Sequence, residues 1–197
     1  LKYENMTSSY ESLGIQPIIN ALASLTMLGG SLMPEEVRKA MDQAAGSFLD
    51  LHQLQLRVGE RLAELTHNEA AYVSCGAASG LLLATAACIS RHTPDAYEDF
   101  SKLNGVPNEV IVQKMHRNSY DYAVQEAGAK MVEIGSNEGT QIEDLERAVS
   151  AATVAIFWFQ GVMNNPSELS LKDVIRSAGK HNVPVIVDAA AQLPPVS

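Results

Sequence analysis

Residues 183–195, VPVIVDAAAQLPP, decide the fold predicted for this chain. The segment opens with branched apolar residues interrupted only by Pro184, and this run ends at Asp188. Such a run is typical of a strand that is buried on both faces of a parallel sheet. A carboxylate at the carboxyl end of such a strand lies where open α/β sheets bind their ligands. The segment therefore predicts an α/β fold with a ligand site beside Asp188.

Two interpretations of Asp188 follow from its position. A buried carboxylate needs a cationic or hydrogen-bonding partner, because removing an unpaired charge from water is costly. The protonated pyridine nitrogen of pyridoxal 5′-phosphate (PLP) is one such partner, and an aspartate there keeps the ring cationic. The alternative is that Asp188 caps the following turn, which is a frequent role of aspartate. The segment alone favours neither interpretation.

The chain upstream of this segment alternates between strand and helix patterns from residue 70 onward. The predicted strands are 70–74, 109–113, 130–134 and 153–159, and the predicted helices are 77–90, 120–127, about 140–148 and about 170–180. The expected caps of the last three helices are, in order, Asn118 or Ser119, a capping box of Thr140 and Glu143, and Ser170. This alternation predicts right-handed crossovers and a mostly parallel sheet with helices on both faces. Before it, residues 1–33 read as an extended arm, and amphipathic helices are predicted at 34–45 and 51–65.

Composition limits the classes of function that are open. The chain has 197 residues, 46% of them hydrophobic and 19% charged, which is typical of a globular protein. Its net charge of −9 and the absence of a Lys/Arg run argue against general nucleic-acid or membrane-surface binding. The sequence shows no signal peptide and no apolar run long enough to span a bilayer. Its two cysteines, Cys75 and Cys88, have no metal-binding or redox spacing, so we expect a reducing, cytoplasmic location.

The loop SCGAASG at residues 74–80 is a candidate anion site. Its small residues lead directly into a helix whose first backbone N–H groups and dipole favour a phosphate. It is neither a P-loop nor a GxGxxG fingerprint. The alternative is that the small residues only let the helix pack closely, and we favour phosphate binding.

Two further loops carry polar residues that suit a flat cofactor. His116 follows strand 109–113, where it could stack on a ring or move protons, or be an ordinary turn histidine. Asn164 or Asn165 follows strand 153–159, where an amide could donate to a phenolate oxygen, although Asn-Asn-Pro is also ordinary turn chemistry.

The order of these features resembles a known family. A small-residue loop, a histidine loop, an asparagine loop and then strand–Asp–Ala–Ala–x–Gln resemble PLP enzymes of fold type I, in the aminotransferase class V-like group. The chain looks most like the branch around bacterial selenocysteine synthase, L-seryl-tRNA(Sec) selenium transferase, which includes D-glucosaminate-6-phosphate ammonia-lyase relatives. The resembling stretches extend over nearly the whole chain: PIINALASLTMLGGS (17–31), NEAAYVSCGAASG (68–80), EVIVQKMHRNSYDYAVQEAGAKMVEIG (109–135) and VPVIVDAAAQLPP (183–195).

The resemblance implies roles for individual residues. His116 would lie over the pyridine ring, Asp188 would pair with the ring nitrogen, and Asn164 would lie near the cofactor. Gln192 would reach the phenolic oxygen, but one extra alanine lengthens its spacing from Asp188, so Ala190 is the alternative lining residue. The residues that would face the PLP phosphate are Gly76, Ala77 and Ala78, with Ser79 as a hydroxyl donor.

The resemblance also implies an incomplete enzyme. Such enzymes carry the lysine that binds PLP covalently downstream of the aspartate, so we expect it beyond Ser197. We expect residues 1–33 to be an N-terminal arm and 34–197 to be part of the PLP-binding large domain. The rest of that domain and the small domain are expected to be absent, and the chain alone is expected to be inactive.

The predicted function is therefore elimination or replacement on an amino-acid-like substrate by the complete PLP-dependent enzyme, either selenium transferase-like or ammonia-lyase-like. A homodimer or higher homo-oligomer is expected, and the charge does not support a tRNA partner. The alternatives are a non-catalytic subunit that keeps the fold without the lysine and, less favoured, a doubly wound nucleotide-binding domain.

Overall fold

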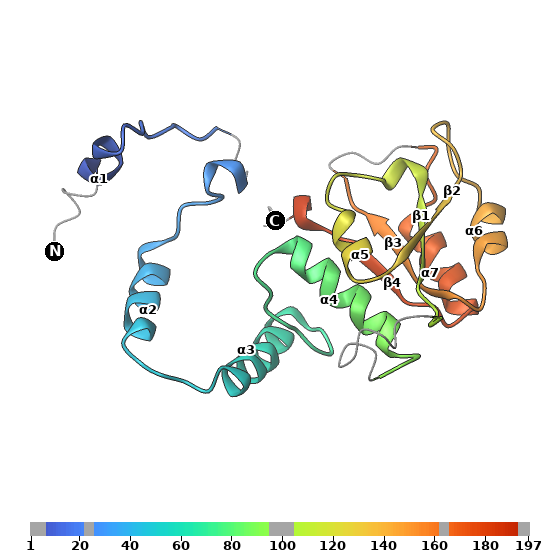
Figure 1. Cartoon of the computed structure of the whole chain (residues 1–197), viewed down its shortest axis with the longest axis horizontal. Coiled ribbons are helices and arrows are strands. Elements are labelled where there is room, and N and C mark those ends of the chain that lie inside the picture. Colours follow the sequence, from blue (N-terminus) through green and yellow to red (C-terminus); the bar gives the residue numbers. More distant parts are fainter. Residues whose placement is uncertain (1–6, 22–25, 95–104, 162–165, 193–197) are drawn as a thin grey trace. The chain divides into compact units, whose positions relative to one another are not determined.

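The computed structural model describes residues 7–21, 26–94, 105–161 and 166–192 (Figure 1). The chain divides into two compact units, Leu1–Leu54 and Gln55–Ser197. The domain boundary expected at residue 33 stays a prediction, and the two units are described separately below. No helix in the described ranges is both long and apolar enough to cross a membrane.

The first unit contains short helices in which none of the side chains with a described burial is buried. They are α1 (Thr7–Ser12), the 3₁₀ turn η2 (Thr26–Leu28), α2 (Glu35–Ala45) and the start of α3. Pro34 precedes α2 and Gly46 ends it, close to the predicted bounds. The apolar stripe predicted for α2 was expected to be buried, but no residue of α2 is. The reason is that none of the residues described in this unit packs on it closely enough to exclude water.

The second unit begins within α3 (Leu51–Thr66), which packs against the extended segment 70–74. Gln55 Nε2 donates to the Val73 carbonyl over 2.7 Å, and a Cβ on Gly59 would lie only 2.4 Å from the Ala71 carbonyl oxygen. The strand predicted at 70–74 is therefore wrong, because this segment is held along α3 and has no strand partner in the described structure.

A four-stranded, all-parallel sheet forms the centre of the second unit. Its strands are β1 (Glu109–Gln113), β2 (Lys130–Ile134), β3 (Thr153–Phe159) and β4 (Val185–Asp188), in the order β2-β1-β3-β4. The predicted bounds of the first three are confirmed. β4 begins after Pro184 and lies at the edge of the described sheet, so Val187 is 38% exposed and the strand is not buried on both faces as expected.

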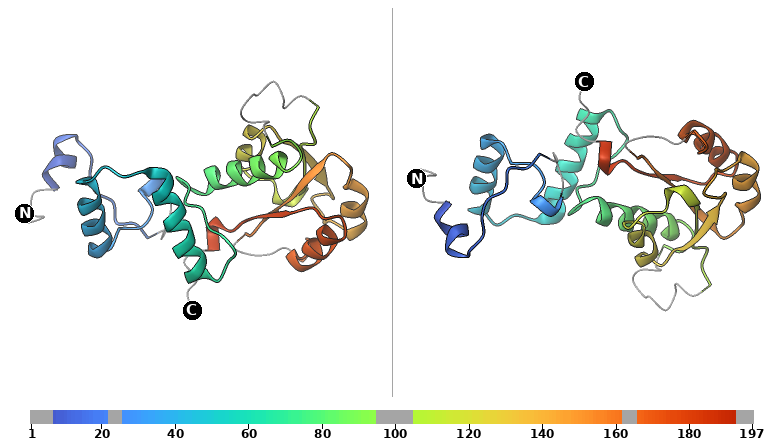
Figure 2. Two further views of the ribbon diagram at one scale, coloured as in Figure 1. Left: turned by 90° about the horizontal axis from the view of Figure 1, so that it is seen from below. Right: turned by 90° about the horizontal axis from the view of Figure 1, so that it is seen from above.

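Helices cover both faces of this sheet, which confirms the predicted α/β class (Figures 1 and 2). Residues of α4 (Ala77–Ser90) and α5 (Tyr122–Glu126) form one apolar cluster with Val110, Phe157 and Ile186. Residues of α6 (Ile142–Ala148) and α7 (Leu171–Lys180) form a second cluster on the opposite face with Ile111 and Ile156. The alternation of side chains along each strand separates the two clusters.

The helix caps agree only in part with the predicted ones. Ser170 Oγ accepts from Asp173 N at the start of α7, as predicted. The capping box predicted from Thr140 and Glu143 is shifted by one residue, since the Gln141 N–H donates to Asp144 Oδ2 over 3.0 Å. The helix predicted from Tyr120, capped by Asn118 or Ser119, begins at Tyr122 after Asp121, because Asn118 instead closes the preceding turn.

Candidate functional site

The candidate site lies at the carboxyl edge of the sheet, beside the amino end of α4. In Figures 1 and 2 the turn η5 (Ala190–Gln192), which follows β4, lies next to the start of α4 in every view. The loops after β1, β3 and β4 leave the sheet at this same edge, because parallel strands all end on one side. The fold therefore brings the loops after β1 and β4 to the same edge as the amino end of α4, and the loop after β3, the fourth one singled out in the sequence, is described only in part.

The amino end of α4 has the features of an anion site. Gly76 occupies the N-cap with φ 149° and ψ 173°, a conformation that other residues rarely adopt. No side chain caps the helix, so the first N–H groups, at Ala77 and Ala78, have no side-chain partner within the described part of the chain. Ser79 Oγ donates to the Gly76 carbonyl over 2.8 Å, and Ser74 Oγ donates to the same oxygen over 2.9 Å. In the described structure a Cβ built on Gly76 would meet no atom within 4 Å, which agrees with the predicted anion site without testing it.

Asp188 ends β4 as a buried carboxylate. It is 5% exposed, and the Ala190 N–H donates to its Oδ1 over 3.1 Å. No cationic side chain in the described ranges lies within ion-pair distance of it. Its partner in the sheet register is Phe159, so its side chain leaves the sheet on the face that carries α4. The structure thus provides a buried anion without a cation, on the same face as the amino end of α4.

Ala190 and Gln192, which follow Asp188 in the turn η5, differ in what they offer a ligand. The Ala190 N–H is occupied by the Asp188 carboxylate, and its side chain is exposed. The Gln192 amide donates to the Gly161 carbonyl over 2.9 Å, which ties η5 to the end of β3. In this structure Gln192 therefore links the turn after β4 to the loop after β3. Its predicted contact with a phenolic oxygen stays a prediction.

His116 is buried against an aromatic residue that the sequence analysis did not single out. It ends the 3₁₀ turn η4 (Lys114–His116), is 2% exposed and stacks on Trp158 with ring centroids 4.5 Å apart. Trp158 pairs with Val187 and Phe159 pairs with Asp188, so the Trp158 and Asp188 side chains leave the sheet on opposite faces. One face of the imidazole is thus covered by Trp158, and its predicted stacking on a cofactor stays a prediction.

The two ring nitrogens of His116 have different surroundings. The Phe159 N–H points at Nδ1 over 3.3 Å, and Glu168 Oε2 lies 3.3 Å from Nε2. The second contact is poorly aligned, so Nε2 is buried without a well-formed hydrogen bond in the described structure. Burial lowers the pKa of His116 below its ordinary value, and the nearby Glu168 carboxylate partly opposes that effect.

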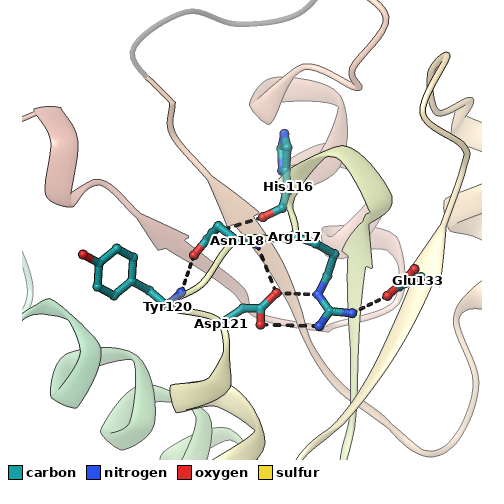
Figure 3. A network of polar contacts seen from close by, with 6 residues as sticks. All are labelled: His116, Arg117, Asn118, Tyr120, Asp121 and Glu133. Carbon is teal, nitrogen blue, oxygen red and sulfur yellow. Dashed lines mark hydrogen bonds and ion pairs between the residues drawn. The ribbon is translucent and has the colours of Figure 1, made fainter.

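The loop that carries His116 is held by a polar network (Figure 3). The Arg117 guanidinium bridges the buried Asp121 and Glu133 on β2, and its hydrogen bond to Asp121 raises the pKa of Arg117. Asn118 Nδ2 donates to the His116 carbonyl over 3.1 Å, and the Asn118 N–H donates to Asp121 Oδ2 over 3.3 Å. These contacts fix the backbone at His116 and in the residues that follow it.

The structure also shows what the sequence analysis missed. Trp158, Glu168 and Gln113 contribute to the same edge. The signal available for Trp158 and Gln113 was their place at or next to a strand end, and Glu168, nine residues after β3, had no such signal. Asn164 lies outside the described residues, so its predicted role stays a prediction. No cluster of three or more potential metal ligands occurs in the described ranges.

The chain is similar in sequence to several known enzymes. No family model matches the chain. It is 32% identical over 193 residues to 5′-C-glycyluridine monooxygenase-decarboxylase from a Streptomyces species, with 94% of this chain and 48% of that protein covered. It is 30% identical over 188 residues to D-glucosaminate-6-phosphate ammonia lyase from Salmonella typhimurium, covering 93% and 51%. It is 24% identical over 196 residues to L-seryl-tRNA(Sec) selenium transferase from Geotalea daltonii, covering 91% and 40%.

The chain is also similar to solved structures of such enzymes. A structure of D-glucosaminate-6-phosphate ammonia-lyase matches with a TM-score of 0.82 and 28% identity, covering 91% of this chain and 50% of that one. GDP-4-keto-6-deoxymannose-3-dehydratase, solved with a PLP–glutamate adduct, matches with a TM-score of 0.52 and 15% identity, which shows the fold alone. The chain spans about half the length of the curated relatives that it matches.

Proposed function

We propose that this chain, a relative of the PLP-dependent fold type I enzymes around selenium transferase and D-glucosaminate-6-phosphate ammonia lyase, is the part of such an enzyme that binds PLP. The complete enzyme would act by elimination or replacement on a small amino-acid-like substrate. The observation that carries the proposal is the buried Asp188 carboxylate, which has no cation beside it in the described structure.

The residues present fit PLP in charge and in position. The cofactor has an anionic phosphate and a ring nitrogen that becomes cationic when protonated. The amino end of α4, with its uncapped N–H groups after Gly76, suits the phosphate. Asp188 lies on the same face of the sheet and would hold the proton on the ring nitrogen. PLP supplies an electron sink to its substrates when it is bound.

The other residues would act by orientation and by excluding water. The Ala190 N–H holds one oxygen of Asp188, which leaves the other oxygen to accept from the ring nitrogen. Gln192 ties the turn after β4 to Gly161, so the backbone beside Asp188 keeps its place. His116 would contribute a buried ring at the same edge, held by Asn118 and by the Arg117 network.

PLP binding by the chain tests the proposal. We expect saturable, near-stoichiometric binding by equilibrium dialysis. Asp188→Asn should still bind PLP through the phosphate contacts but alter its absorption, because the ring nitrogen loses its anionic partner. Asp42→Asn, on the exposed face of α2, is the matched control and should behave like the wild type. An absence of saturable binding by the wild-type chain would contradict the proposal.

The second test measures turnover by the complete enzyme. Asp188→Asn should reduce kcat strongly, because the carbanion that forms on the substrate loses its electron sink. Near-normal turnover of this variant would remove Asp188 from the assigned role.

No lysine of this chain is predicted to bind PLP covalently. Lys114, in η4, is the lysine nearest to a strand's carboxyl end, and the lysines on α2 and α7 and at the start of β2 are exposed. Borohydride reduction of the chain with PLP, followed by peptide mapping, should therefore find no stoichiometric modified lysine. A single fully modified site would refute this assignment.

A further inference from the structure

A buried cluster of three side chains, Trp158, His116 and Glu168, lies at the carboxyl edge of the sheet. Trp158 and His116 are each 2% exposed, and the Glu168 side chain is 13% exposed. The imidazole stacks on the indole with an interplanar angle of 18°. Two ring nitrogens in this cluster, His116 Nε2 and Trp158 Nε1, are buried without a well-formed hydrogen bond in the described structure. Buried polar atoms of this kind require an explanation, because nearly all such atoms in folded proteins are paired.

The backbone decides which His116 nitrogen carries the proton. The Phe159 N–H is a donor and lies 3.3 Å from Nδ1, so Nδ1 must accept. In the neutral ring the proton is therefore on Nε2, which points toward Glu168. Glu168 Oε2 lies 3.3 Å from this nitrogen, close enough for a hydrogen bond but badly aligned for one. No other hydrogen-bond acceptor for Nε2 occurs in the described ranges.

Glu168 is itself held in place by its neighbours along the chain. The Leu169 N–H donates to Oε1 of the buried Gln113, at the end of β1, over 2.8 Å. The Ser167 carbonyl accepts from the Thr140 N–H over 3.0 Å. The segment that carries Glu168 is thus fixed on both sides to the loops at the strand ends. The position of its carboxylate beside His116 is therefore a consequence of the fold.

We propose that Glu168 is a positioning residue. It accepts a hydrogen bond from Nε2–H of His116, holds the imidazole against Trp158 and favours the charged form of that imidazole. As far as it concerns a cofactor, this proposal rests on the function proposed above. The charged groups around His116 in the described structure are Glu168, the neighbouring Lys114 in η4, and Arg117, which is engaged by Asp121 and Glu133.

NMR titration of the histidine rings tests the proposal without any cofactor. His116 is assigned among the chain's five histidines by the signal that disappears in His116→Gln. We expect long-range ¹H–¹⁵N spectra to show the Nε2–H form, and Glu168→Gln to move the His116 midpoint to lower pH. Glu143→Gln, the same substitution at an exposed position of α6, should leave the midpoint unchanged. Trp158 is the only tryptophan, so its fluorescence provides an independent optical titration of the same ring.

Each outcome decides the proposal. An unchanged His116 midpoint in Glu168→Gln, or a neutral ring that carries its proton on Nδ1, would overturn it. Far-UV circular dichroism shows whether Glu168→Gln folds. Glu168→Asp keeps the charge on a shorter side chain, so its His116 midpoint should lie closer to that of the wild type than the midpoint of Glu168→Gln does. If Glu168→Gln does not fold, a Glu168→Asp midpoint equal to that of the wild type supports the proposal, and one shifted upward overturns it.

PLP binding separates this proposal from the proposed function. If both hold, Glu168→Gln should bind PLP several-fold more weakly than the wild type, as measured by quenching of Trp158 fluorescence, whereas Glu143→Gln should not. A wild-type chain that fails to bind PLP refutes the proposed function, while the NMR titration still decides the role of Glu168.

Discussion

The conformation of Gly76 leads to a prediction whose sign can be tested. With φ 149° and ψ 173°, Gly76 lies in a region of backbone space that is essentially restricted to glycine. A Cβ built on it would meet no atom within 4 Å, so Gly76→Ala introduces no steric clash with the rest of the protein. Its cost is therefore backbone strain alone, which amounts to about 1–3 kcal/mol for a residue held in such a region.

Gly179→Ala is the matched control for this substitution. Gly179 lies within α7, and a Cβ there would likewise meet no atom within 4 Å. The two positions differ in backbone conformation, because Gly179 is helical and alanine is the better helix former. We expect Gly179→Ala to stabilise the chain by about 0.5–1 kcal/mol. The two variants should therefore change the free energy of unfolding in opposite directions.

Urea unfolding followed by far-UV circular dichroism measures both changes. Where the loop at Gly76 can relax, part of the strain will be relieved by movement of the N–H groups at the start of α4, and PLP binding will weaken instead. The two measurements are therefore made on the same samples. A Gly76→Ala chain with both wild-type stability and wild-type PLP affinity would refute the reasoning.

Three other predictions concern the core, the acid stability and the association of the chain. Leu145→Ala removes a fully buried side chain and should cost about 2–5 kcal/mol of unfolding free energy in a denaturant titration, whereas Ile175→Ala, at a 52% exposed position, should cost far less. Hydrogen bonds from His181 and Lys180 lower the pKa of Glu146 to about 2 from its ordinary 4.5, so its stabilising effect is complete above pH 4.5 and is lost as the pH falls toward 2. In thermal unfolding scans, Glu146→Gln should make the melting temperature fall less steeply with pH over this acid range, and an unaltered fall would argue against this role of Glu146. The exposed apolar side chains of the unit Leu1–Leu54 predict self-association at micromolar concentration, which a clean monomer in sedimentation velocity would exclude.

The sheet was the most predictable part of the fold. The apolar runs at β1 and β3 predicted the bounds that the structure has, because a strand buried between helix layers is largely apolar. The bounds of β2 were also predicted correctly, although this edge strand exposes Lys130 and Glu133. The segment 70–74 has a similar local pattern, but it pairs with α3 through Gln55, and no local pattern reveals such a partner. Periodicity thus predicts which segments are extended, and tertiary contacts decide whether they join the sheet.

The candidate site was predictable by residue type but not by partner. The end of β4 could be placed at Asp188, and its burial followed from the strand that it terminates. The stacking of His116 on Trp158 joins residues that lie far apart in the sequence, so no local pattern could predict it. The same holds for Glu168, whose position depends on a hydrogen bond between Leu169 and the side chain of Gln113. Contacts of this kind are set by strand order, which a single sequence does not specify.

The strand order β2-β1-β3-β4 has a consequence for how the protein folds during synthesis. Of the four strands described here, β4 is synthesised last, and it docks against β3 only after a crossover through α7. Closing such long loops before any contact forms makes parallel pairing slow. Within the described sheet, β4 and Asp188 therefore join after β1, β2 and β3 have been able to pair. A ligand that binds this edge would act late in folding, by trapping β4 in its docked position.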